Sequence, residues 1–127
     1  MEVNTEKVMI LLQRKYNAVR ELDKLTKELE AFIARNDSVS AAMILQLRGD
    51  EMEKIERCME EIWQMAHSQE EHEYLRTLVA SDLETAEGTS TEEKKIMEIR
   101  RKTEAVLVRL RETDQRLNKK LGKKRKL

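Results

Sequence analysis

The chain has 127 residues, no proline and three glycines; 39% of its residues are charged and 3% are aromatic. This length fits one domain, and the scarcity of proline and glycine permits long uninterrupted helices. The composition excludes a β-sandwich or barrel, which needs many turn residues and β-branched alternation. Three scattered glycines also exclude the Gly-rich phosphate loop of a Rossmann or P-loop enzyme.

The net charge of zero hides a segregation of charge along the chain. Residues 94–127 hold fourteen Lys or Arg against four Asp or Glu, so they carry +10 while residues 1–93 carry −10. Such asymmetry bears on partners and solubility rather than on fold. A lone cysteine, Cys58, cannot form an internal disulfide, which fits a reducing compartment. Apolar runs of at most five residues and an N-terminus without a signal-peptide pattern predict a cytoplasmic protein without membrane insertion.

Apolar residues at helical spacing predict a first helix over 4–35. Its seam consists of Val8, Leu12, Val19, Leu22, Leu29 and Ile33. Asn36-Asp37-Ser38 predicts a turn, because these side chains satisfy free backbone N–H groups at turns and helix starts. A second helix is predicted over 38–67, and we favour a continuous helix with a possible kink over a full turn at Gly49-Asp50.

Later in the chain, Ser68 stands three residues before Glu71, the spacing of a capping box. The second helix therefore either breaks at Ser68 or extends as far as residue 85. Residues 87–91 form the clearest loop, and a last helix is predicted over 91–121. Gly122 is expected to stop it and to leave 122–127 as a flexible basic tail.

These elements predict an all-α fold, an elongated antiparallel helical bundle of three to four long, coiled-coil-like helices. Short loops between long helices favour antiparallel neighbours. Residues 1–121 are predicted to form a single helical domain. The apolar seams exceed what a chain of this size is expected to bury alone, so we expect some apolar surface to be left for another protein.

The sequence carries no pattern of residues typical of an active site or a metal site. His67 and His72 are five residues apart, so they do not share one helix face, and the Glu-x-x-His pairs of di-iron bundles are absent. Cys58 has no histidine at a distance that would activate it. The carboxylates are dispersed with Lys or Arg three or four residues away, as in solvated ion pairs. We therefore predict no catalytic residue, metal or cofactor, and hence no enzyme.

The second segment resembles the FlgN-like flagellar export chaperones. The pattern consists of Asn36-Asp37-Ser38 followed by Ala41, Ala42, Leu45, Asp50, Lys54 and Ile55. The chain length, the Met-rich second helix and the long last helix are similar too. The resemblance implies a cytosolic chaperone of flagellar type III secretion, which binds and holds hook-associated subunits before export. It also implies that the helical ends of these clients bind an apolar surface in the C-terminal part.

On this sequence the matching partner-binding candidates are the apolar residues of the last helix. They are Val106, Leu107, Leu110, Leu117 and Leu121. Trp63 is a further candidate, because it lies beside the apolar seam of the second helix, where it either packs an inter-helix edge or anchors a partner.

Two other classes of protein stay open at this point. The first is a structural coiled-coil adaptor or scaffold subunit, in which the same seams serve homo-oligomerisation. The second is a helical nucleic-acid-associated protein that uses the Lys-rich C-terminus. No aromatic residues are interleaved with these lysines, so base stacking has no support and nucleic acid is the weaker alternative.

Overall fold

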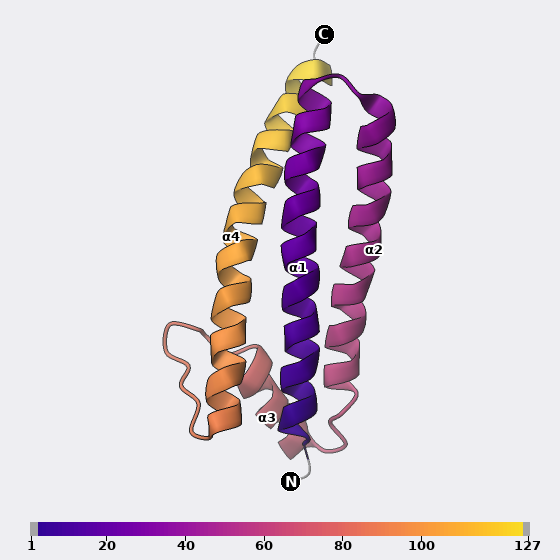
Figure 1. Ribbon diagram of the computed structural model, residues 1–127. Helices are drawn as coiled ribbons and strands as arrows, with labels where there is room; N and C mark the ends of the chain where they lie inside the picture. The colour runs from indigo at the N-terminus through magenta and orange to yellow at the C-terminus, as the bar shows by residue number, and fades with distance from the viewer. Residues whose placement is uncertain (1–2, 126–127) are drawn as a thin grey trace.

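The computed structural model describes the backbone of residues 3–125 and the side chains of residues 3–122, and it is all-α over this range. The helices are α1 (Thr5–Ala34), α2 (Ser38–Trp63), α3 (Gln69–Val79) and α4 (Thr91–Arg125). Figure 1 shows an elongated bundle in which α1 lies between α4 and α2, with the short α3 at the lower end. The predicted fold class, a helical bundle without strands in the described residues, is confirmed.

The long helices are arranged around α1. It packs along both α2 and α4, whereas no Cα atom of α2 lies within 8 Å of a Cα atom of α4 over the described residues. The α2 helix runs antiparallel to the other two long helices (Figure 1). Directly packed helices have axes 8–10 Å apart, so the axes of α2 and α4 lie farther apart than those of directly packed helices.

The first two helices are joined by the predicted turn. Asn36 adopts a φ of 57°, a left-handed conformation that asparagine tolerates better than most residues. The side chain of Asp37 then accepts a hydrogen bond from the backbone N–H of Ser40 at 3.1 Å and caps α2. The helix continues through Gly49, so the preference for a continuous helix over a full turn is confirmed.

Two predicted helix ends are placed differently. The second helix ends at Trp63 rather than at residue 67. Ser68 caps the separate helix α3, and its hydroxyl accepts a hydrogen bond from the backbone N–H of Glu71 at 3.1 Å. The last helix continues through Gly122 to Arg125, so the predicted stop at Gly122 is wrong. A glycine inside a helix costs only about 1 kcal/mol relative to alanine, and no glycine here has a positive φ. Residues 126–127 of the predicted tail lie outside the described residues.

The interior consists of two clusters with different numbers of helices. The lower cluster uses all four helices and contains Val8, Leu11, Leu12, Ile62, Leu75, Leu78 and Ile96. The upper cluster uses only α1, α2 and α4 and contains Leu25, Leu29, Ala41, Ile44 and Leu117. The α3 helix approaches both α2 and α4, so it fills the space between them at the lower end alone.

The start of α4 is tied to α3 by a carboxylate with several donors. Glu93 accepts hydrogen bonds from the Tyr74 hydroxyl at 2.7 Å, the Thr89 N–H at 3.0 Å and the Thr89 hydroxyl at 2.8 Å. These donors, with the Thr89 N–H contributing most, lower the pKa of Glu93 to about 2. Hydrogen bonds to the ionised form favour that form.

This contact predicts a pH dependence of stability. Because the pKa of Glu93 is depressed in the folded state, its contribution is complete above pH 4.5 and is lost as the pH falls towards 2. We expect Glu93→Gln to lower the free energy of unfolding by about 1 kcal/mol at pH 7. Denaturant titrations should show this difference shrinking between pH 4.5 and pH 2. A difference that is constant over that range would contradict the prediction.

Candidate protein-binding groove

An apolar groove lies between α2 and α4 at the upper end of the bundle, above the space that α3 fills. Its volume is about 550 Å³. All three long helices line it. The apolar lining residues are Leu29 and Ile33 of α1, Ala41, Ala42 and Leu45 of α2, and Leu117 and Leu121 of α4, and the polar ones are Arg48 of α2 and Asp114 and Asn118 of α4. The turn residues 36–38 close its end. The groove thus lies over the cluster in which only three helices pack.

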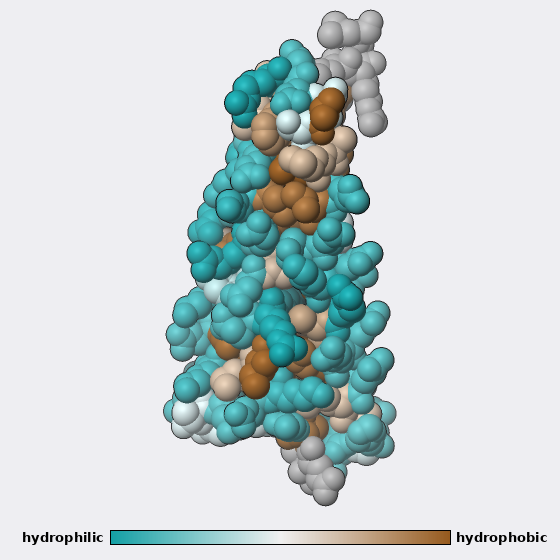
Figure 2. Space-filling model, turned by 45° about the vertical axis from the view of Figure 1, so that its right-hand side comes forward, coloured by the Kyte–Doolittle hydropathy of each residue, from teal (hydrophilic) through white to brown (hydrophobic). Residues whose placement is uncertain are grey.

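The floor and the rim of the groove differ in exposure. Leu29 and Leu117 are buried and form the floor, whereas Leu45 on α2 is 53% exposed and Leu121 on α4 is 37% exposed. Figure 2 shows hydrophobic residues interrupting the hydrophilic surface near this upper end. Two large apolar side chains on facing rims make a surface that a partner helix can bury.

A second apolar strip lies on another side of α2. Val39, Met43 and Leu47 follow one another at four-residue spacing and are 81%, 56% and 41% exposed. None of them lines the groove. The α2 helix therefore carries apolar surface on two sides, because at this level it packs mainly against α1.

One ion pair crosses the groove between its two walls. Arg48 Nη2 of α2 lies 3.2 Å from Asp114 Oδ1 of α4. The Arg48 side chain is only 13% exposed, and its Nε is buried without a hydrogen-bond partner among the described residues. The Asp114 side chain is 41% exposed. The pair thus forms a polar layer beside the apolar part of the groove, and Asn118 is a further polar residue of the lining.

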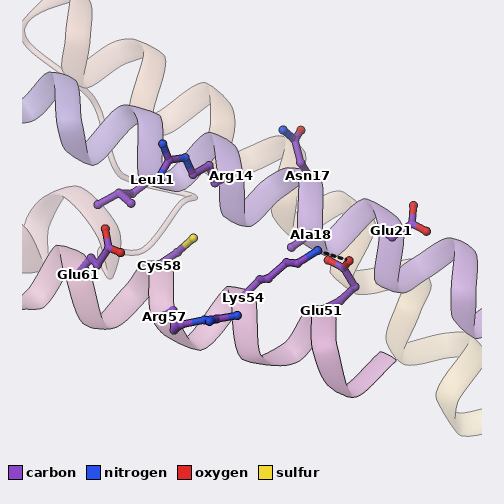
Figure 3. A pocket seen from close by; sticks show the side chains of 10 residues that line it. All are labelled: Leu11, Arg14, Asn17, Ala18, Glu21, Glu51, Lys54, Arg57, Cys58 and Glu61. Carbon is purple, nitrogen blue, oxygen red and sulfur yellow. Dashed lines mark hydrogen bonds and ion pairs between the residues drawn. The ribbon is translucent and has the colours of Figure 1, made fainter. Parts of the chain in front are cut away.

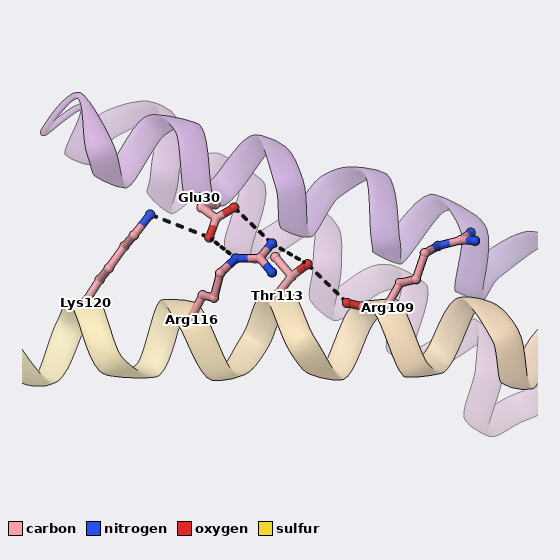
Figure 4. A network of polar contacts seen from close by, with 5 residues as sticks. All are labelled: Glu30, Arg109, Thr113, Arg116 and Lys120. Carbon is pink, nitrogen blue, oxygen red and sulfur yellow. Dashed lines mark hydrogen bonds and ion pairs between the residues drawn. The ribbon is translucent and has the colours of Figure 1, made fainter.

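The α4 wall is fixed to α1 by a network on another side of α4, which Figure 4 shows. The Glu30 carboxylate of α1 accepts a hydrogen bond from Arg116 Nε at 3.1 Å and lies 3.6 Å from Lys120 Nζ. The hydrogen bond from Arg116 is the main cause of the lowered pKa of Glu30. Arg116 also donates to Thr113 Oγ1 at 3.2 Å. Part of the basic surplus of the last helix therefore serves packing within the molecule.

The structure separates the predicted partner-binding residues of α4 into two groups. Val106, Leu110 and Leu117 are buried within the bundle, and Leu117 is also part of the groove floor. The physical reason is that this stripe of α4 packs on α1. Leu121 stands at the groove rim, while Leu107 is half-buried and lines a separate small cavity beside the end of α3.

Trp63 belongs to the joint between α2 and α3. It is half-buried against the lower core cluster, and its ring stacks on His72 with centroids 5.1 Å apart. The structure therefore shows it packing an inter-helix edge, one of the two roles that the sequence left open. The groove residues Ala42 and Leu45, which appeared in the sequence only as part of the family resemblance, were missed as binding candidates.

Another hollow of about 540 Å³ lies between α1 and α2 and is lined mainly by charged residues (Figure 3). Cations and carboxylates line it in equal numbers, and Lys54 pairs with Glu51 at 2.8 Å. Cys58 is buried beside it, and burial raises the pKa of this thiol. A protonated, buried thiol is a poor nucleophile. This hollow therefore offers neither an excess of one charge nor an activated group.

The described residues hold neither a metal-binding cluster nor a membrane-spanning helix. No group of three or more His, Cys, Asp or Glu is placed to hold a metal ion over this part of the chain. No helix within residues 3–125 is both long and apolar enough to cross a bilayer. The chain matches no protein-family model, and no curated protein and no solved structure matches it.

Proposed function

We propose that this protein is a chaperone of the FlgN-like type, which binds a helical end of a hook-associated flagellar subunit and holds it before export. The observation that carries the proposal is the apolar groove with Leu45 and Leu121 exposed on facing rims. The resemblance of residues 36–55 to these chaperones supplies the client class. Because the client is held before export, we place this activity in the cytoplasm.

The groove suits a helix as its occupant. At the lower end α3 lies between α2 and α4 and contributes Leu75 and Leu78 to the core. At the upper end the corresponding position carries no helix of this chain among the described residues, and the apolar floor continues there. An amphipathic client helix with apolar residues at three- and four-residue spacing completes the upper layer as α3 completes the lower one.

The mechanism requires no chemical step. A client helix that buries its apolar stripe on Leu45 and Leu121 removes that stripe from water, at about 25 cal/mol for each Å² of apolar surface. The same stripe is then unable to drive self-association of the client. The 39% charged residues keep the free chaperone soluble despite its exposed apolar rim.

The scaffold-subunit alternative has one observation in its favour. Val39, Met43 and Leu47 give α2 a second apolar side outside the groove, and a subunit with two apolar surfaces is able to assemble into higher oligomers. The nucleic-acid alternative draws less support, because Arg116 and Lys120 already pair with Glu30.

Co-expression with hook-associated subunits tests the proposal. We expect a soluble complex of defined size, measured by size-exclusion chromatography with light scattering, with the chaperone a monomer or dimer. A client truncated at its helical end should fail to co-purify. A high oligomer that forms without client would favour the scaffold, and the absence of a complex with every hook-associated subunit would remove the proposed function.

A further inference from the structure

The polar layer in the groove places a requirement on whatever covers it. The pairing of Arg48 uses only the Oδ1 oxygen of Asp114, so the second carboxylate oxygen and the other guanidinium N–H groups at the groove make no hydrogen bond with each other. The Arg48 Nε is already buried in the free protein, and a client does not change this. In the free protein the 41% exposed Asp114 side chain is reached by water. A helix lying across the rims removes that water, and a buried donor or acceptor without a partner is costly.

A purely apolar client stripe therefore does not complement this groove. It matches Leu45 and Leu121 but covers the second oxygen of Asp114 without offering it a donor. A client carboxylate supplies an acceptor for Arg48. It also places a second negative charge beside Asp114 in a site from which the bound helix excludes water, and like charges repel there. A client cation has the opposite defect, because it repels Arg48.

A carboxamide has the two complementary groups without net charge. Its carbonyl oxygen accepts a hydrogen bond from Arg48, and its NH₂ donates to the second oxygen of Asp114. We propose that the groove selects an amphipathic helix that carries one Gln or Asn within its apolar stripe, placed against the Arg48–Asp114 pair. Such a buried polar contact also fixes the register of the bound helix, as single polar residues do in coiled coils. The proposal rests on the proposed function, since it describes the client of the same groove.

Two synthetic 21-residue amphipathic helices test this selection by isothermal titration calorimetry. They are identical except at the centre of the apolar stripe, where one carries Leu and the other Gln. The wild-type protein is expected to bind the Gln peptide about tenfold more tightly than the Leu peptide. The variant R48M/D114L, which makes the layer apolar, should prefer the Leu peptide, whereas the single variant R48M should still prefer Gln, because its Asp114 carboxylate still needs a donor.

Controls separate this selection from general effects of removing charge. Glu98 and Lys102 form an exposed ion pair at 3.3 Å on α4 outside the groove, so E98L/K102M should keep the wild-type preference. Circular dichroism checks that each variant is folded. An equal preference ratio for wild type and R48M/D114L would overturn the proposal while leaving the groove as a helix site. Failure of both peptides to bind any of these proteins would count against the groove itself and so against both proposals.

Discussion

Replacing Ile62 with alanine is expected to lower the free energy of unfolding by about 3 kcal/mol. Ile62 is fully buried in the lower cluster, where α1, α2, α3 and α4 meet. Removing its side chain beyond Cβ forfeits apolar burial and leaves a cavity, and such large-to-small core changes typically cost 2–5 kcal/mol. Urea denaturation followed by circular dichroism measures the change.

The matched control for this prediction is Leu45→Ala. Leu45 is a similar aliphatic residue on the same helix, but it is 53% exposed, so its loss should change stability by less than about 0.5 kcal/mol. A loss below 1 kcal/mol for Ile62→Ala would show that the lower cluster is not a tightly packed core. Equal losses at both positions would lead to the same conclusion.

The second large effect is expected on client binding. The variant L45E/L121E places a carboxylate on each rim of the groove, where client binding would bury it in an apolar surrounding. Burying an unpaired charge is strongly unfavourable, so the affinity for a hook-associated subunit should fall by about a hundredfold or more. Stability should change little, because both side chains are already exposed. Titration calorimetry and thermal unfolding measure the two quantities.

The chain offers a close control for this variant. Ile10 and Val108 are 44% and 45% exposed and lie outside the groove. I10E/V108E therefore adds the same charge and removes the same kind of exposed apolar surface at other positions. It should bind the client as the wild type does. Equal affinity loss in the two variants would refute the groove as the client site and indicate a nonspecific effect of charge.

Most of the fold could be predicted from local patterns. Helical spacing of Val8, Leu12, Val19 and Leu22 located α1, and the turn at residues 36–38 was placed by side chains that cap helix starts. The end of α2 could not be placed from local patterns, because residues 64–68 contain neither Gly nor Pro and the capping spacing at Ser68 was compatible with a continuing helix. The fold resolves this point by packing Leu75 and Leu78 of α3 between α2 and α4.

The candidate site was predicted less well, for a physical reason. Periodicity shows that a helix has an apolar stripe, but it does not show which stripe a neighbouring helix covers. The Val106, Leu110 and Leu117 stripe of α4 is covered by α1, and these residues are buried. Leu45 lies on α2 at a level where α3 is absent, so a residue of similar apolar character remains exposed.

The position of α1 as the common neighbour of α2 and α4 has a consequence for recognition. Since the two outer helices lack backbone contact with each other over the described residues, the distance between the groove walls is set by how each of them packs on α1. Side chains alone, chiefly Arg48 reaching Asp114, span the gap. A substitution in either seam of α1, at a residue outside the groove lining, therefore changes the space between the walls without touching a residue that lines it.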